Sequence, residues 1–150
     1  MKNISDMSIL ITGGGSGIGE GTASYFVKNG AKVTICGRNM DKLENVSKKL
    51  GDSCHAVKCD VTKNDERKNL IDEAINHGHK LDALINNVGV AGPTGNLEKL
   101  ESDDWEKTLK INVISHFYFN KIAIPMLKKN KGGSIINLSS GAGIMGFPLR

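Results

Sequence analysis

A glycine-rich turn near the N-terminus constrains the fold of this chain more than any other feature. The apolar run Met7–Thr12 leads directly into the residues GGGSGIG at positions 13–19. A helical pattern follows as far as Gly30, with Ile18 and Phe26 on one face. Glycine has no Cβ atom, so such a turn can bend sharply, admit a ligand close to the backbone and direct free N–H groups toward an anion. The sequence therefore predicts a strand, a tight phosphate-accessible turn and a helix in direct succession.

Short apolar runs alternate with helical patterns along the rest of the chain. The runs are rich in Ile, Val and Leu, as expected for strands that are covered on both faces. They are Met7–Thr12, Lys32–Cys36, His55–Cys59, Leu81–Ile85 and Ser134–Ser139. Strand–helix–strand alternation predicts a parallel sheet with right-handed crossovers. We therefore expect one α/β domain over residues 1–150, built on a doubly wound parallel sheet.

The helical patterns have ends that can be read from the sequence. Apolar residues at helical spacing over Met40–Leu50 predict a helix with Asn39 as its N-cap and Gly51 as its stop. Two longer helices are expected further along the chain. One runs from Thr62 to Gly78, with Asp65 completing a capping-box-like start, and the other runs from Ser102 to about Asn130, with Pro125 kinking or ending it.

The composition disfavours several classes of protein. The net charge of +4 comes from 20 Lys and Arg against 16 Asp and Glu, and aromatic residues make up only 5%. Nucleic-acid binding calls for a clustered basic stripe with interleaved aromatic residues, which this chain lacks. The longest uncharged apolar run is too short to span a bilayer, and the first eight residues lack the pattern of a secretion signal. We therefore expect a cytoplasmic protein with neither a membrane nor a nucleic-acid partner.

The cysteines and histidines form no recognised disulfide or metal pattern. Cys36, Cys54 and Cys59 are odd in number and contain no C-x-x-C pair, which predicts reduced and buried thiols. A metal site built on the histidines is an alternative. However, His77 and His79 straddle a predicted helix stop, with no carboxylate or cysteine at ligand spacing beside them. We interpret them as ordinary surface histidines and expect no metal.

The glycine-rich turn fits a dinucleotide better than a nucleoside triphosphate. A P-loop needs Lys and then Ser or Thr after its last glycine, but Gly19 is followed by Glu20 and Gly21. The common dinucleotide pattern G-x-G-x-x-G is also absent, and the residues from Thr12 to Gly19 read T-G-x-x-x-G-x-G. The alternative is a loop that only connects a strand to a helix, which four glycines in this context disfavour.

The residues after the second predicted strand bear on which dinucleotide is bound. A carboxylate about 20 residues past the glycine turn normally accepts the ribose hydroxyl groups of NAD. This chain has Gly37, Arg38 and Asn39 there instead. The Arg38 guanidinium can form a paired contact with a phosphate, which predicts NADP(H) as the cofactor and makes NAD the less favoured one. The alternative is that Arg38 is an idle solvated residue.

Further motifs follow the glycine turn in a fixed order. Asp60-Val61 follows the third predicted strand, Asn86-Asn87-Val88-Gly89 follows the fourth, Asn112 lies in the long helix, and Ser139-Ser140 closes the fifth strand. Together with T-G-x-x-x-G-x-G, this set resembles the short-chain dehydrogenase/reductase family over nearly the whole chain. The resemblance implies a Rossmann-type sheet and NAD(P)-dependent oxidation or reduction of alcohols and carbonyls by direct hydride transfer.

The same resemblance implies which residues contact the dinucleotide. They are Thr12, Gly13, Gly15, Ser16, Gly17, Ile18 and Gly19 around the pyrophosphate, Arg38 at the 2′-phosphate, Asp60 and Val61 at the adenine, and Asn87 and Gly89 beside the ribose. Val88 stands where the family usually has Ala, an apolar change that the site is expected to absorb.

Catalysis in the family uses Asn, Ser, Tyr and Lys, and the resemblance gives Asn112 and Ser140 the first two roles. The Tyr and Lys are required as Y-x-x-x-K, but Tyr25 is followed four residues later by Asn and Tyr118 by Ile. The motif is expected just beyond Arg150, after the Ser-Ser turn. Residues 1–150 are therefore expected to be inactive by themselves, because general acid–base help of about 10²–10⁴-fold is missing.

We therefore expect the chain to be a C-terminally incomplete Rossmann-type domain of an NADP(H)-dependent oxidoreductase. The strand Ser134–Ser139 is then an open sheet edge with apolar side chains. The long helix before it belongs, by family resemblance, to a subunit interface, so a homo-oligomer is expected together with a small alcohol or carbonyl substrate. The alternative is a catalytically silent dinucleotide-binding module that acts by binding or by pairing with another subunit.

Overall fold

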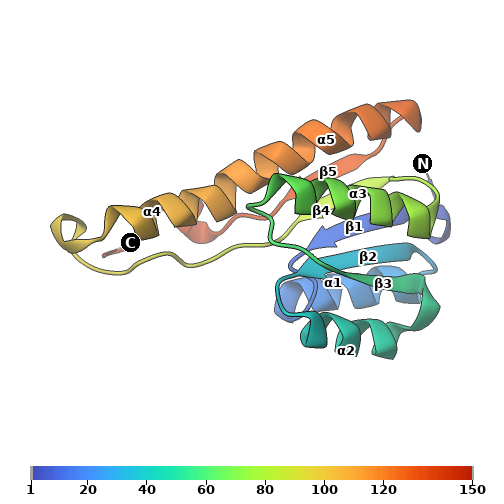
Figure 1. Cartoon of the computed structure of the whole chain (residues 1–150), viewed down its shortest axis with the longest axis horizontal. Coiled ribbons are helices and arrows are strands. Elements are labelled where there is room, and N and C mark those ends of the chain that lie inside the picture. Colours follow the sequence, from blue (N-terminus) through green and yellow to red (C-terminus); the bar gives the residue numbers. More distant parts are fainter. Residues whose placement is uncertain (1, 150) are drawn as a thin grey trace.

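The computed structural model describes residues 2–149 and contains a parallel sheet with helices on both faces (Figure 1). The five strands lie in the order β3-β2-β1-β4-β5, so the chain reverses direction across the sheet after β3. Their bounds are β1 Ser8–Thr12, β2 Lys32–Gly37, β3 Cys54–Lys58, β4 Ala83–Asn86 and β5 Ser134–Asn137. This arrangement confirms the predicted doubly wound α/β fold, with strand ends that differ from the prediction by one or two residues.

Five α-helices connect or follow these strands. They are α1 Gly17–Lys28, α2 Met40–Leu50, α3 Asn64–Gly78, α4 Ser102–Leu109 and α5 Ser115–Lys129. A π-helical turn, Lys110–Ile114, joins α4 to α5. The predicted caps of α2 are confirmed, because the side chain of Asn39 accepts a hydrogen bond from the Lys42 N–H at 3.0 Å and Gly51 has a φ of 73°. None of these helices is long and apolar enough to cross a membrane.

One expectation about helix ends was wrong, and one of two alternatives for Pro125 is excluded. The start of α3 is not a capping box on Thr62, because the helix begins at Asn64 and its N-cap, Lys63, makes no side-chain cap bond. The Thr62 hydroxyl instead donates to the Asp60 carboxylate at 2.8 Å. The last long helical stretch runs from Ser102 to Lys129, as predicted, and α5 continues through Pro125 rather than ending there. Packing of α5 on the sheet stabilises the helix despite the missing N–H.

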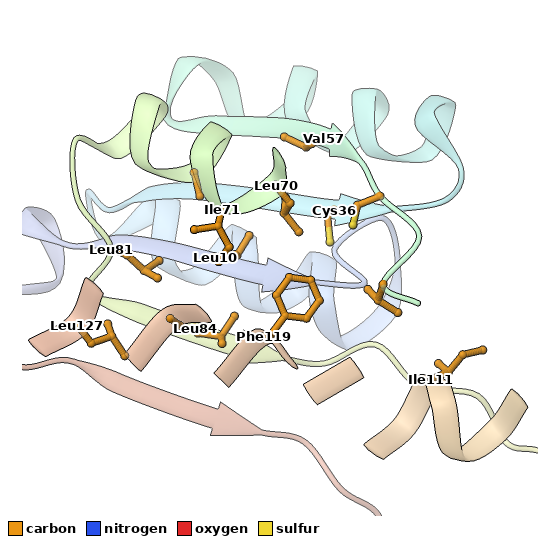
Figure 2. Close-up of a cluster of buried hydrophobic side chains, with 14 residues drawn as sticks. Leu10, Cys36, Val57, Leu70, Ile71, Leu81, Leu84, Ile111, Phe119 and Leu127 are labelled. Atoms are coloured by element: carbon orange, nitrogen blue, oxygen red, sulfur yellow. The ribbon is translucent and has the colours of Figure 1, made fainter. Parts of the chain in front are cut away.

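The strands alternate between two apolar cores. Leu10 of β1 faces α3 and α5, where Leu70, Phe119 and Leu127 are buried (Figure 2). Its neighbours Ile9 and Ile11 face the other way, and their cluster includes Ala23 of α1 and Leu43 and Val46 of α2. Because both faces are covered, β1 and β4 are buried along their whole length, as parallel strands normally are. The predicted buried and reduced state of the cysteines is confirmed, since Cys36, Cys54 and Cys59 are all buried and free.

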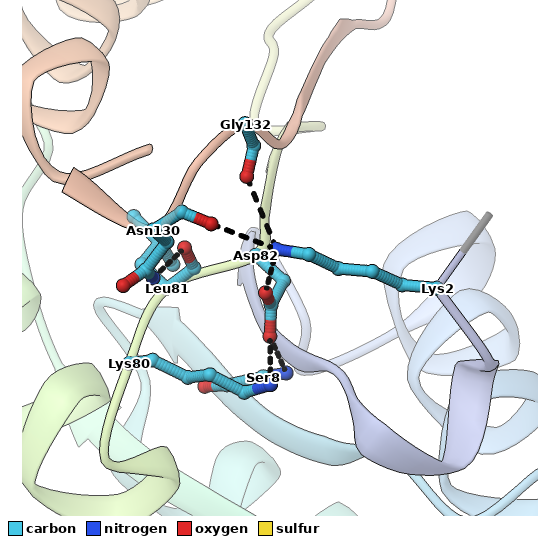
Figure 3. A network of polar contacts seen from close by, with 7 residues as sticks. All are labelled: Lys2, Ser8, Lys80, Leu81, Asp82, Asn130 and Gly132. Carbon is cyan, nitrogen blue, oxygen red and sulfur yellow. Dashed lines mark hydrogen bonds and ion pairs between the residues drawn. The ribbon is translucent and has the colours of Figure 1, made fainter. Parts of the chain in front are cut away.

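A buried carboxylate ties the N-terminal segment to the sheet. Asp82, directly before β4, accepts hydrogen bonds from the Lys2 ammonium at 2.7 Å and from the Ser8 N–H at 2.9 Å (Figure 3). Lys80 lies 3.2 Å from the second carboxylate oxygen. Lys2 also donates to the Gly132 carbonyl oxygen at 3.1 Å. This network joins the starts of β1, β4 and β5, so it lies at the edge of the sheet opposite the glycine-rich turn.

Candidate dinucleotide-binding site

The glycine-rich turn is closed by contacts that leave no room for side chains at Gly13, Gly14 and Gly19. Gly13 and Gly17 have φ angles of 72° and 57°, a region that glycine adopts without strain. The N–H groups of Gly13 and Gly14 donate to the Cys36 carbonyl oxygen at 2.8 and 3.0 Å, which anchors the turn to β2. A Cβ atom on Gly19 would lie 2.2 Å from the Gly13 carbonyl oxygen, so α1 begins directly against the turn. The turn therefore forms a cradle at the N-terminal end of a helix, as anion sites do.

Asn87 and Thr12 lock this cradle to the end of β4. The Asn87 side-chain amide donates to the carbonyl oxygens of Thr12 and Gly13 at 2.8 and 3.1 Å. In return, the Thr12 hydroxyl accepts the N–H groups of Asn87 and Val88, each at 3.1 Å. Thr12 is fully buried, so these bonds are shielded from water. The structure thus brings the residues predicted at the pyrophosphate beside those predicted at the ribose.

The remaining residues predicted on the turn are accessible. Ser16 and Gly17 are exposed, Gly15 is half-buried, and the Ile18 side chain is 70% exposed. Gly19 and Ala23 are the buried residues of α1, so Ile18 is not on the face that packs against the sheet. An exposed apolar side chain at the first turn of α1 is available to cover a bound ligand.

Two cavities meet at Arg38. The larger has a volume of about 770 Å³ and is also lined by Asp60, Arg67 and Tyr118. The smaller, of about 310 Å³, lies against Val90, Gly92 and Pro93 of the segment that follows β4. Arg38 is exposed, so its guanidinium is free to turn toward a ligand at either cavity.

Asp60 carries a carboxylate that is held in its ionised form. Its partial burial opposes ionisation, but hydrogen bonds from the Thr62 N–H and hydroxyl and the positive charges of Arg38 and Lys63 outweigh this and lower its pKa. Its own N–H donates to the Glu66 carboxylate at 2.7 Å. The Asp60–Val61 segment is therefore negatively charged and fixed against the first turn of α3.

The predicted catalytic residues lie on different elements. Asn112, in the π-helical turn, accepts a hydrogen bond from the Val90 N–H at 2.9 Å and donates to the Val90 carbonyl oxygen at 2.8 Å. Ser140 follows β5, and its hydroxyl accepts a bond from the Ala142 N–H at 3.3 Å. Asn112 thus braces the helix against the segment after β4, whereas the Ser140 side chain is exposed.

A polar ladder next to Asn112 was not predicted. His116 contacts the Val88 carbonyl oxygen at 3.1 Å, and the Asn120 side chain accepts a bond from Asn86 at 2.8 Å. Asn112, His116 and Asn120 are spaced by four residues, so they share one helix face. Their partners at positions 90, 88 and 86 are spaced by two, as on one face of a strand. These matching spacings can be seen in the sequence and would predict that the helix packs against the segment around residues 86–90. The ladder leaves Asn87, whose side chain bonds to Thr12 and Gly13, on the side of the glycine-rich turn, whereas a Cβ atom on Gly89 would lie 3.6 Å from the Asn112 side-chain oxygen.

His55 and His77 lie close to each other, away from this ladder. His55 lies 3.1 Å from a Glu73 carboxylate oxygen, and its ring centroid is 5.4 Å from that of His77. The His55–Glu73 contact joins β3 to α3 between residues 18 positions apart, so no local ligand spacing predicts it. Within residues 2–149, no three His, Cys, Asp or Glu side chains are arranged to hold a metal ion.

A parallel sheet with a glycine cradle at its first crossover defines a nucleotide-binding α/β protein. The short chain dehydrogenase family model matches residues 7–150, and the chain belongs to that family. An oxidoreductase of Staphylococcus saprophyticus, described as uncharacterized, is 42% identical over 99% of this chain. A 3beta-hydroxysteroid dehydrogenase of Mediterraneibacter gnavus is 35% identical over 99% of the chain. The alignments cover 60% and 54% of those two relatives, so the chain spans well under two thirds of their length.

Solved structures of the same type agree with this assignment. A 3-ketoacyl-(acyl-carrier-protein) reductase of Brucella melitensis, complexed with NADH, superimposes with a TM-score of 0.93 at 31% identity, covering 97% of this chain and 62% of that one. An NAD+-bound xylitol dehydrogenase gives a TM-score of 0.92 at 28% identity, covering 99% of this chain and 58% of that one. The order of strands and helices is therefore that of the short-chain dehydrogenase fold.

Proposed function

We propose that this chain is the dinucleotide-binding part of an NADP(H)-dependent oxidoreductase acting on a small alcohol or carbonyl compound. The observation that carries the proposal is the cradle in which Gly19 packs against the Gly13 carbonyl oxygen and Asn87 ties Gly13 to the end of β4. A glycine turn packed directly against the N-terminus of a helix is suited to a backbone-bound pyrophosphate. When bound, the nicotinamide supplies the hydride chemistry, and the residues of this chain bind and orient it.

The residues proposed to contact the dinucleotide lie along the edge formed by the carboxyl ends of the strands. The turn from Thr12 to Gly19 faces the pyrophosphate, Asp60 and Val61 face the adenine, and Asn87 and Gly89 face the ribose. Exposed Ile18 covers the bound phosphates. The main-chain bonds of Asn87 and Thr12 fix the cradle before any ligand binds, which reduces the ordering cost of binding.

Preference for NADP(H) over NAD(H) is proposed from Arg38. Its guanidinium is exposed beside both cavities, and its positive charge helps to lower the pKa of Asp60, one strand over. A charge-assisted hydrogen bond to a 2′-phosphate is worth roughly 1.5–3 kcal/mol. Nothing negative stands directly after β2 to accept ribose hydroxyl groups, since the next residues are Arg38 and Asn39.

The catalytic roles proposed for this chain belong to Asn112 and Ser140. Asn112 holds its helix against the segment that lines the ribose, and the Ser140 hydroxyl is exposed to donate a hydrogen bond to a substrate oxygen. Neither Tyr25 nor Tyr118 is followed by Lys at the fourth position, so residues 1–150 carry no matched proton donor. We propose that these residues alone bind the dinucleotide without turnover.

A second candidate is a catalytically silent binding module that acts by pairing with another subunit. A pairing surface is available in either case. The exposed large apolar side chains of the α4–α5 region are Trp105, Leu109, Val113, Ile114, Phe117, Tyr118 and Ile124. We propose that this region packs against another copy in a homo-oligomer, and that the protein acts in the cytoplasm without a nucleic-acid or membrane partner.

Titration of the purified chain with NADPH and NADH tests the proposal. Trp105, the one tryptophan, reports binding by fluorescence, and calorimetry measures the affinity directly. We expect saturable binding, tighter for NADPH. The absence of heat, fluorescence change and thermal shift in a folded sample would contradict the site, and equal or tighter NADH binding would contradict the proposed preference alone. Turnover of a carbonyl panel by the chain would contradict the proposed lack of a proton donor.

A further inference from the structure

Arg67, in the first turn of α3, is a buried cation that the proposed dinucleotide contacts do not use. It is only 4% exposed, and its Nη1 donates to the Val61 carbonyl oxygen at 2.8 Å. Its guanidinium carbon lies 4.5 Å from the centroid of the Tyr118 ring. Its Nε has no hydrogen-bond partner within residues 2–149. Removing a guanidinium from water costs free energy, and a carbonyl oxygen and a ring repay that cost only in part. An apolar side chain would fill the same space without this cost, so the presence of Arg67 suggests a specific role.

The contacts of Arg67 connect the Asp60–Val61 segment to α5. Glu66, the preceding residue, accepts the Asp60 N–H at 2.7 Å, so two consecutive residues of α3 hold two consecutive residues after β3. Tyr118 of α5 then provides the surface on which the guanidinium rests. The Arg67 side chain therefore fixes the position of Val61 relative to both α3 and α5.

We propose that Arg67 is a positioning residue for the adenine end of the bound dinucleotide, acting through Val61 and seated on Tyr118. This inference rests on the proposed function, which gives Asp60 and Val61 the adenine contacts. Arg67 lines the larger cavity together with Asp60, so movement of Val61 changes the wall against which the base lies. A lysine can donate to the Val61 carbonyl oxygen but cannot stack a planar group on Tyr118 at the same time.

The test compares wild type with Arg67→Met and Arg67→Lys, using NADPH and its analogue that carries hypoxanthine in place of adenine. The matched control is Lys68→Met, which removes an exposed cation from the next position of α3. We expect Arg67→Met to weaken NADPH binding about tenfold, Arg67→Lys to lie between it and wild type, and the control to bind as wild type does. The preference for adenine over hypoxanthine should fall in the same order.

Variants of Tyr118 distinguish the loss of the contact between the Arg67 guanidinium and the Tyr118 ring from a failure to fold. Tyr118→Phe keeps a ring face for the guanidinium and should bind NADPH as wild type does, whereas Tyr118→Leu should resemble Arg67→Met. If Arg67→Met does not fold, the NADPH affinities of Arg67→Lys, Tyr118→Phe and Tyr118→Leu test the proposal in its place. Wild type that binds no NADPH contradicts the proposed function. If wild type binds and the folded Arg67 variants keep its affinity and base preference, or lose both ligands equally as their melting temperature falls, only the role of Arg67 is contradicted.

Discussion

Gly19 lies so close to Gly13 that a Cβ atom built on it would be 2.2 Å from the Gly13 carbonyl oxygen. Gly19→Ala must therefore push α1 away from the turn, and we expect it to lower the free energy of unfolding by about 1–3 kcal/mol and to abolish dinucleotide binding. Gly21, two residues further along α1, has no atom within 4 Å of the position that a Cβ atom would occupy, which makes it the matched control. Gly21→Ala should keep binding and add roughly 0.5–1 kcal/mol of stability. Equal denaturation curves for the two variants would contradict this account of the cradle.

Arg38→Ala tests the phosphate preference without disturbing the fold. Because Arg38 is exposed, its loss should leave the melting temperature nearly unchanged. We expect the NADPH affinity to fall by roughly tenfold or more, whereas the NADH affinity changes little. Lys58→Ala, at the end of the neighbouring strand, controls for a general loss of positive charge. A parallel loss of both cofactors in Arg38→Ala would show that the residue does not read the 2′-phosphate.

The architecture could be predicted because hydrophobic periodicity and glycine chemistry act locally. The strands β1 to β5 can be recognised as short apolar runs, and the ends of α2 can be recognised from the residue types of its N-cap, Asn39, and its C-cap, Gly51. The start of α3 could not be predicted because Thr62 uses its hydroxyl on Asp60, a choice that depends on a turn formed in three dimensions. Likewise, α5 passes through Pro125 because tertiary packing outweighs the local penalty.

The candidate site was predictable only in part for the same reason. The glycines and Asn87 can be recognised by residue type and order, whereas Arg67 reads in the sequence as one more basic residue in a helix. Its contact with Tyr118 joins residues 51 positions apart along the chain, which no local pattern contains. His116 and Asn120 carried a usable signal, a spacing of four that matches alternate positions after β4, but it gains meaning only once the helix and strand are known to pack together.

The three cysteines should be unreactive in the folded chain. Burial raises the pKa of Cys54 to about 11, and a hydrogen bond with Cys59, together with burial, raises the pKa of Cys36 well above its usual value. The thiolate is the reactive form of cysteine, so a disulfide reagent at pH 8 should label the native chain slowly. After unfolding in guanidinium, the same reagent should label all three thiols at once. Because the raised pKa values favour the neutral thiols, stability should decline as the pH rises above about 8.5, where unfolded cysteine ionises. Rapid labelling of native chain would contradict the burial.

The network around Asp82 predicts the opposite pH dependence at the acid end. Burial opposes ionisation of Asp82, but the bonds from Lys2, Ser8 and Lys80 outweigh it and lower its pKa below the usual value. The ionised carboxylate therefore stabilises the fold above the unfolded-state pKa of about 3.9, and this contribution disappears as the pH falls through the lower pKa of the folded state. Asp82→Asn should lower the free energy of unfolding by about 1–3 kcal/mol at pH 7.

Denaturant titrations of wild type and Asp82→Asn at several pH values measure that contribution. The difference in unfolding free energy between the two should shrink as the pH is lowered below about 4, because the unfolded-state carboxyl then binds a proton that the folded carboxylate accepts only at lower pH. Asp72→Asn, at an exposed position on α3, should show no comparable difference at either pH. A wild-type advantage that stays constant from pH 7 to pH 3 would mean that Asp82 stabilises the junction of β1, β4 and β5 by its shape and hydrogen bonds, and that its charge contributes nothing.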